Sequence, residues 1–214
     1  RFSRKLSPLL IRKLLTYSCK ISKPDKLKLG VDATGLSMDK GSYHYLMRAG
    51  KIQKQRKIIQ ITACALLDKQ LISSIQVQQR KTVVNNLFIP VVMESSKLGD
   101  VEYVAADKGY DFNANHKCVL RKLNALSCIK VREKCLGRKS KMRKIGLSTY
   151  DDNKYHQRSK METIFSVIKR RYLDGVKGKS PITKKREGMQ KVITYNIDRL
   201  CKIIYEIILG CHQS

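Results

Sequence analysis

Several residue types and patterns are scarce in this chain of 214 residues or missing from it. It has no tryptophan and only 4 phenylalanines, and 17 acidic residues stand against 45 lysines and arginines. No apolar run reaches the roughly 18 residues that a membrane-spanning helix needs, so no segment is predicted to cross a membrane. A G-x-x-x-x-G-K-S/T phosphate loop is also missing, so ATP is not implied.

The 7 cysteines form no recognisable framework. Their number is odd, no C-x-x-C pair occurs, and no cysteine and histidine pairs follow zinc-finger spacing. We therefore predict free thiols in a reducing cytoplasm. The histidines form no ligand or nucleophile constellation either; they are His44, His116, His156 and His212.

The charge balance points to a partner. The formal net charge is +28, and a surplus of this size repels itself unless a polyanion neutralises it. The 10 tyrosines could stack on bases in place of the missing tryptophan. Ribosomal and membrane-surface proteins are also basic, so composition favours nucleic acid without fixing its kind.

The start of the chain, "RFSRKLSPLLIRKLL", is basic and amphipathic and has no signal-peptide cleavage pattern. The chain begins at Arg1 rather than methionine, and we interpret the start as truncated. Residues 1–26 are predicted to form a helical and linker segment, and residues 27–214 a single domain.

Hydrophobic periodicity gives the order of the elements. Strands are predicted at 27–36, 100–111 and 125–131, with a hairpin over 56–79. Helices are predicted at 81–97 (interrupted by Pro90), 113–124, about 152–173, and 185–209. The basic segment 132–144 has no apolar period and is predicted to be a solvated loop. The order is that of an α/β, ribonuclease-H-like domain, a mixed sheet flanked by helices.

Carboxylates fall where such a fold would bring them together. In this sheet the first and fourth strands are neighbours, and Asp32 and Asp107 lie near their carboxyl ends. A late helix beside that edge could add a third carboxylate. Clustered carboxylates repel one another unless divalent cations neutralise them, and two Mg²⁺ ions about 3.5–4 Å apart can promote displacement at phosphorus.

The segment "YHQRSKMETIFSVIK" (155–169) supplies the candidate helix. On one continuous helix, Tyr155, Arg158, Glu162 and Lys169 fall within an arc of about 60°, next to an apolar stripe that can dock on the sheet. Glu162 would then border the core, with Arg158 and Lys169 placed to hold phosphates. Taken alone, Arg158 and Glu162 are better explained as an ordinary i, i+4 ion pair.

Three motifs together resemble the DDE transposases of prokaryotic insertion sequences, over about residues 27–209. They are "VDATGL" around Asp32, "AADKGYD" around Asp107, and the Tyr-x2-Arg-x3-Glu-x6-Lys pattern at 155–169. The resemblance implies that Asp32, Asp107 and Glu162 are catalytic metal ligands. They would hold two Mg²⁺ ions, for which Mn²⁺ can substitute. It also implies that Tyr155, Arg158 and Lys169 position the DNA.

The same resemblance implies the activity and the partners. The family cleaves the 3′ ends of its element and joins them to target DNA, commonly as a dimer or larger assembly on double-stranded DNA. A cytoplasmic, nucleoid-associated homo-oligomer is therefore expected. The basic segments 132–144 and 177–191 are expected to track DNA phosphates.

Three other interpretations stay open from the sequence. One is a defective transposase fragment, another is a related metal-dependent nuclease that joins no strands, and the third is a basic nucleic-acid-binding protein without catalysis. Weaker acidic candidates lie in predicted loops or turns: Asp39, Asp68 and Asp111.

Overall fold

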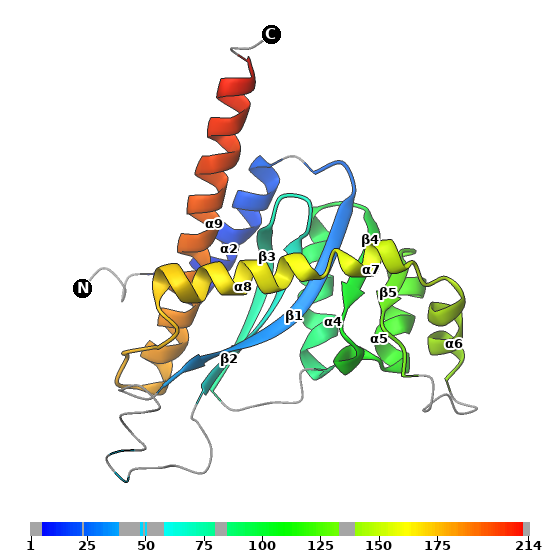
Figure 1. Ribbon diagram of the computed structural model, residues 1–214, viewed down its shortest axis with the longest axis horizontal. Coiled ribbons are helices and arrows are strands. Elements are labelled where there is room, and N and C mark those ends of the chain that lie inside the picture. Colours follow the sequence, from blue (N-terminus) through cyan, green and yellow to red (C-terminus); the bar gives the residue numbers. More distant parts are fainter. Residues whose placement is uncertain are drawn as a thin grey trace.

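The structure is a computed structural model that describes residues 6–22, 24–38, 58–79, 85–132 and 140–211, together with residues 48 and 50. Within these residues five strands form one mixed sheet in the order β3-β2-β1-β4-β5 (Figure 1). The strands are β1 (Leu27–Ser37), β2 (Ile58–Leu66), β3 (Leu71–Gln78), β4 (Val101–Ala106) and β5 (Leu126–Ile129). The strand β1 runs antiparallel to β2 and parallel to β4, and β5 continues the parallel half. The predicted ribonuclease-H-like α/β fold is confirmed.

Helices cover both faces of the sheet (Figure 1). The α-helices are α2 (Pro8–Ile21), α4 (Asn85–Ser95), α5 (Asn113–Lys117), α6 (Lys141–Ser148), α7 (Asp152–His156), α8 (Ser159–Tyr172) and α9 (Pro181–Cys211). Short helical turns follow at η1 (Ser96–Leu98), η2 (Lys108–Tyr110) and η3 (Cys118–Lys122). The alternation of side chains along each strand therefore gives two buried faces rather than one.

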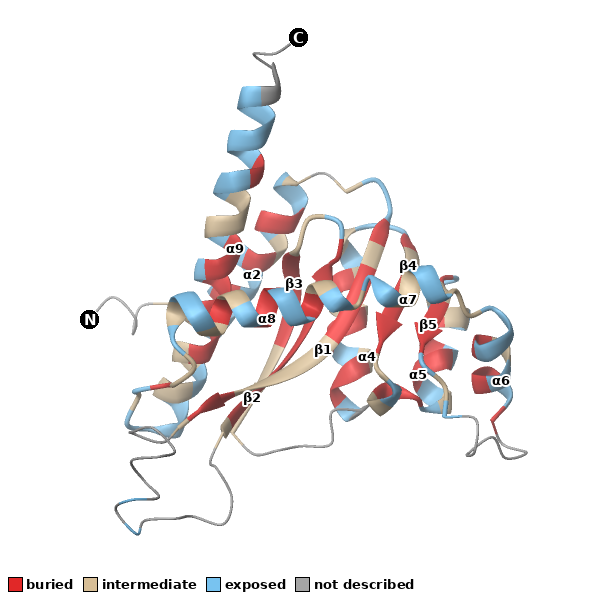
Figure 2. Ribbon diagram, in the orientation of Figure 1, coloured by how far each residue is buried: buried red, intermediate tan, exposed pale blue. Residues whose placement is uncertain are grey.

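Two cores lie on the two sides of the sheet (Figure 2). On β2, Ile61 and Ala63 face the core that α8 and α9 cover, whereas Cys64 and Leu66 face the core with α4. The predicted stripe on α8 is confirmed, since Met161, Ile164, Phe165 and Ile168 are all buried. Their burial fixes the face that α8 turns to the sheet.

The end of α8 is fixed by α9. Leu173 leaves the helix with a left-handed φ of 70°. The buried ammonium of Lys191 donates hydrogen bonds to the carbonyl oxygens of Tyr172 and Leu173. Two of the carbonyls left without partners at the helix end are thereby satisfied.

The segment predicted as one helix over about 152–173 is divided into α7 and α8. Between them the backbone tightens: the N–H of Arg158 donates to the carbonyl of Tyr155 at 2.9 Å, and that of Met161 to the carbonyl of Arg158 at 2.8 Å. These i→i+3 bonds change the helical phase at Arg158. The 60° arc calculated for a continuous helix therefore does not hold across this junction.

The prediction of a solvated loop over 132–144 is wrong from Lys141 onward. Lys141–Ser148 form α6, whose buried face consists of Met142, Arg143 and Gly146. Residues 133–139 lie outside the described part of the chain. The second basic segment is also largely helical, because α9 begins at residue 181 rather than 185.

The N-terminal helix α2 packs Ile11 and Leu15 into the core beside α9 and β3. The division of the chain at residue 26 stays a prediction. At the other end, the last turns of α9 project from the body of the domain and are largely exposed (Figure 2). Among the described helices none is long and apolar enough to cross a membrane.

Candidate active site

The strand register brings three charged residues into a row. Ala106 of β4 is paired with Val31 of β1 on one side and with Ile129 of β5 on the other. The residues that directly follow these three are Asp107, Asp32 and Lys130. Because side chains alternate along a strand, all three belong to the face of the sheet that α7 and α8 cover.

The backbone orients both aspartates in the same way. The Oδ1 of Asp32 accepts the N–H of Ala33 at 2.8 Å, and the Oδ1 of Asp107 accepts the N–H of Lys108 at 2.6 Å. Each carboxylate is thus held by the residue that follows it. Asp32 and Asp107 are both partly exposed.

Glycine 30 lets α8 approach β1 closely. A Cβ built on Gly30 would lie 2.5 Å from Cδ2 of Leu67 and 3.0 Å from Cγ of Met161. Met161 directly precedes Glu162 on α8. The missing side chain at residue 30 therefore determines how near Glu162 comes to Asp32, two residues further along β1.

Arg158 connects the helix to the strand. Its guanidinium lies 2.8 Å from Oε1 of Glu162 and 3.8 Å from Oδ2 of Asp32, and 5.8 Å from the centre of the Tyr155 ring. The Arg158–Glu162 pair is the i, i+4 ion pair that the sequence also allowed. Arg158 additionally bridges two predicted metal ligands and so neutralises part of their charge.

The carboxylates influence one another electrostatically. Burial raises the pKa of Asp32 above its ordinary value, and the neighbouring charges of Asp107 and Glu162 raise it further. The N–H of Ala33 and the guanidinium of Arg158 oppose this shift. Asp32 therefore feels the negative charge of both other members of the predicted triad.

Glu162 is the most exposed of the three carboxylates. Its side chain is 61% exposed and bonds to Arg158. In the described part of the chain, no three His, Cys, Asp or Glu side chains are gathered closely enough to hold a metal ion. The prediction that Asp32 lies near the end of its strand is wrong, because β1 continues along β2 as far as Ser37, beyond its last pair with β4 at Val31. Asp32 therefore lies inside β1 and Asp107 directly after β4, on adjacent strands, while Glu162 lies near them on α8.

The donor set nevertheless suits a divalent cation. Three carboxylates supply the oxygen ligands that Mg²⁺ prefers. Burial, and to a smaller extent the charges of Asp107 and Glu162, raise the pKa of Asp32, and a bound cation would favour its charged form. Release of Glu162 from Arg158 would be needed for a complete set of ligands.

Lys130 is a candidate functional residue that the sequence analysis missed. Its ammonium lies 5.4 Å from the centre of the Tyr155 ring and its side chain is exposed. An ammonium at this distance over a tyrosine is a cation–π contact. In the sequence Lys130 is one basic residue among many, and only its register with Asp107 distinguishes it.

Lys169 lies apart from the carboxylates. It is seven residues beyond Glu162, about 10 Å further along the helix. Its ammonium is 3.7 Å from Oδ1 of Asp174. Of the three predicted DNA-positioning residues, Tyr155 and Arg158 lie near the carboxylates, whereas Lys169 lies about two helical turns away.

The weaker candidates do not join this site. Asp68 forms an ion pair with Lys28 at 3.4 Å, and Asp111 is buried in a separate polar network. Asp39, His44 and His212 lie outside the described residues.

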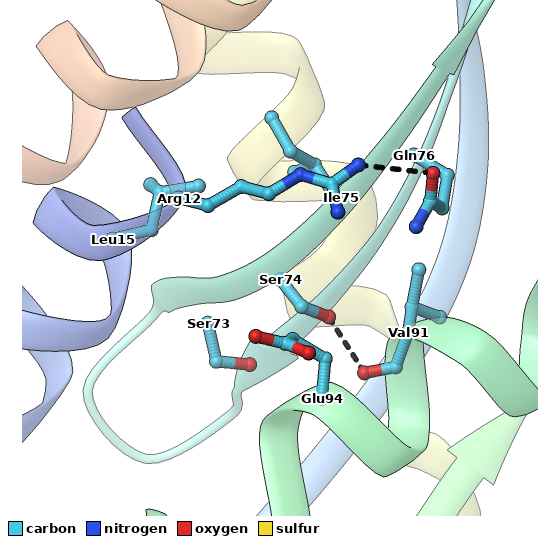
Figure 3. A pocket seen from close by; sticks show the side chains of 8 residues that line it. All are labelled: Arg12, Leu15, Ser73, Ser74, Ile75, Gln76, Val91 and Glu94. Atoms are coloured by element: carbon cyan, nitrogen blue, oxygen red, sulfur yellow. Dashed lines mark hydrogen bonds between the residues drawn. The ribbon is translucent and has the colours of Figure 1, made fainter. Parts of the chain in front are cut away.

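A small cavity between α2, β3 and α4 also lies away from the carboxylates. It is lined by Arg12, Leu15, Ser73, Ser74, Ile75, Gln76, Val91 and Glu94 (Figure 3). At about 10 Å³ it has room for a single water at most, so it is not a substrate pocket.

The fold and the site together define a ribonuclease-H-like domain with one carboxylate inside β1, one directly after β4 and one on the helix α8. The sequence matches the family described as "Transposase DDE domain" over residues 23–197, more than four-fifths of the chain. The chain belongs to this family of DDE transposase domains. A search of curated proteins and a search of solved structures give no match.

Proposed function

We propose that this domain cuts the 3′ ends of a mobile DNA element and joins them to target DNA, with Asp32, Asp107 and Glu162 as the ligands of two divalent cations. Mg²⁺ is the expected ion and Mn²⁺ a substitute. The observation that carries the proposal is the position of Asp32 and Asp107, each directly after the last residue pair of the parallel strands β1 and β4, on the face of the sheet that carries the helix with Glu162.

When bound, two such cations would activate a water or a 3′-hydroxyl and stabilise the leaving oxygen at phosphorus. Asp32 and Asp107 would hold their carboxylates in place through the hydrogen bonds from Ala33 and Lys108. Glu162 would exchange its ion pair with Arg158 for metal ligation. Arg158 would then be free to bind a phosphate of the DNA. The same movement would therefore allow both metal ligation by Glu162 and phosphate binding by Arg158.

The surroundings of Asp107 suit a DNA backbone. Lys108, Lys130 and Arg132 are exposed where β4 and β5 end, and the chain as a whole carries a net charge of +28. Contacts of this kind hold phosphates without reading sequence. Tyr155 would keep Lys130 in position through the cation–π contact, and Lys169 would bind a phosphate further along the duplex.

The proposed partner is double-stranded DNA, at the element's ends and at the target. A homo-oligomer on paired ends, acting in the cytoplasm at the nucleoid, belongs to the same proposal. It rests on the family and on the charge, and on no contact described above.

The experiment is a cleavage and joining assay on a labelled duplex that carries the element's own ends. Wild type, Asp32→Ala, Asp107→Ala and Glu162→Gln are compared with Mg²⁺ and with EDTA. We expect Mg²⁺-dependent nicking and joined products for wild type. Each variant should reduce cleavage at least about 10³-fold while DNA retention in a gel shift persists.

Other outcomes would replace the proposal with one of its rivals. Nicking without joined products would indicate a metal-dependent nuclease. Tight binding without nicking in wild type would indicate a defective fragment or a binding protein. A variant with normal cleavage would remove that residue from the site.

A further inference from the structure

A buried polar network surrounds Asp111, four residues after Asp107. Arg143 of α6 donates to both carboxylate oxygens of Asp111, with Nε 2.7 Å from Oδ1. The backbone N–H of Arg132 donates to Oδ2 at 2.7 Å, and Nε2 of His116 lies 3.1 Å from Oδ1. The other ring nitrogen of His116 lies 2.9 Å from the hydroxyl of Ser127.

The charges in this network are well defined. Burial alone would raise the pKa of Asp111, but the hydrogen bonds from Arg143, Arg132 and His116 outweigh it and hold that pKa below its ordinary value. Burial lowers the pKa of His116, so its ring is neutral. Because a carboxylate only accepts, Nε2 carries the hydrogen and Nδ1 accepts from Ser127.

The linked serine, histidine and aspartate are not a nucleophilic site. Ser127 and His116 are fully buried, and Asp111 is 4% exposed, so no substrate reaches the hydroxyl. The network instead links the segments after β4 and β5 to the helix α6.

The network joins the two segments that follow β4 and β5 to the start of the helical segment over the site. Asp111 belongs to the stretch after Asp107, and Arg132 to the stretch after Lys130. Arg143 also donates to the carbonyl of Arg132 at 3.2 Å. It thereby connects both stretches to α6, which leads into α7 and Tyr155.

The helix α6 packs closely against the network. A Cβ on Gly146 would lie 2.3 Å from Nδ1 of His116. In addition, the side chain of Asn113 accepts the N–H of Met142 in the first turn of α6 at 2.9 Å. These contacts define the position of α6 relative to α5.

We propose that the Asp111–Arg143 pair is a positioning device for the active site. By fixing α6 against the segments after Asp107 and Ile129, it sets where α7 delivers Tyr155 beside Lys130. Its effect on catalysis rests on the proposed function, whereas its effect on the position of α7 does not.

The test uses hydrogen exchange and cleavage on the full chain. Asp111→Asn removes the carboxylate charge that faces the Arg143 guanidinium, and Arg143→Lys keeps the positive charge but loses the bidentate hydrogen bond. In both variants we expect amides 152–158 to exchange at least about tenfold faster than in wild type. The Mg²⁺ concentration for half-maximal cleavage should rise at least about fivefold, with a smaller change in DNA affinity.

The matched control is Asn196→Ala. Asn196 is fully buried and bonds to both backbone groups of Ile72, at 2.9 Å and 2.7 Å, on the opposite part of the fold. Its loss should raise exchange in α9 and β3 but not in residues 152–158.

Two results would overturn the positioning role. One is wild-type exchange over 152–158 in both network variants. The other is an equal loss of protection throughout the chain, including α9, which would make the pair a contributor to overall stability alone. If wild type cuts no DNA, the proposed function fails while the exchange result still decides this inference.

Discussion

Gly30→Ala should weaken both the fold and the proposed site. The new methyl carbon would lie 2.5 Å from Leu67 and 3.0 Å from Met161, against the 3.5–4.0 Å or so of an ordinary carbon contact. Both neighbours are fully buried, so the new methyl group has to be accommodated within the packed core. Overpacking of this kind costs about 1–3 kcal/mol, or roughly 2–12 °C in Tm for a chain of this size.

The consequence for activity follows from α8. Relief of the contact with Met161 moves α8 outward by a few tenths of an ångström, which takes Glu162 away from Asp32. Since a misplacement of about 1 Å can reduce a reaction rate about 10²-fold, this smaller shift should reduce cleavage by up to about tenfold. Thermal unfolding gives the change in Tm and Mg²⁺-dependent nicking gives the change in cleavage rate, and both are measured on the same preparations.

Gly188→Ala is the matched control. Its new Cβ would meet Ile61 at 3.6 Å, an ordinary contact, in the interior of α9. Alanine in a helix is favoured over glycine, so Tm should stay the same or rise by the equivalent of about 0.5–1 kcal/mol. If Gly30→Ala has the same Tm and the same nicking rate as Gly188→Ala, the close approach of α8 to β1 does not hold the site together.

Three further predictions concern charge. Lys130→Ala should reduce the slope of log affinity against log salt for duplex DNA by about one, whereas Lys20→Ala on α2 leaves it unchanged; equal slopes would remove Lys130 from the DNA surface. Asp32→Asn should raise Tm at pH 7 while it abolishes cleavage, because burial and carboxylate neighbours raise the pKa of Asp32 and so disfavour its charged form. That gain should disappear as the pH falls to about 4, and a lower Tm at pH 7 would contradict the electrostatic account. The pKa of Asp111 is lowered, so its contribution to stability is present above about pH 4 and lost as the pH falls through the lower, folded-state pKa; acid unfolding of Asp111→Asn should therefore be less steep than that of wild type.

Much of the fold could be predicted because its signals are local. Leu27, Leu29 and Val31 alternate on β1, and the two apolar runs of the hairpin are separated by a turn at residues 67–70. The apolar stripe of α8 has helical spacing and is buried as expected. These patterns need no knowledge of neighbours in space, so the fold class followed from them.

The missed features depend on contacts between distant residues. The buried face of α6 includes Arg143 and Gly146, one charged and one without a side chain, so burial along this helix does not follow hydropathy. Lys130 gains significance only from the β4–β5 register. Asp111 and Arg143 are 32 residues apart in the sequence, and only the fold pairs them.

The most direct test of the central claim asks whether Asp107 is a ligand of the catalytic metal ion. Asp107→Cys replaces a carboxylate with a thiolate, which binds Mg²⁺ poorly but accepts softer ions such as Mn²⁺ better. If Asp107 is a metal ligand, the variant will not nick the end-bearing duplex in Mg²⁺ and will regain at least about tenfold activity in Mn²⁺, while Asp107→Ala regains none. Equal activity of the two variants in Mn²⁺, or normal cleavage by either in Mg²⁺, would contradict metal ligation by Asp107.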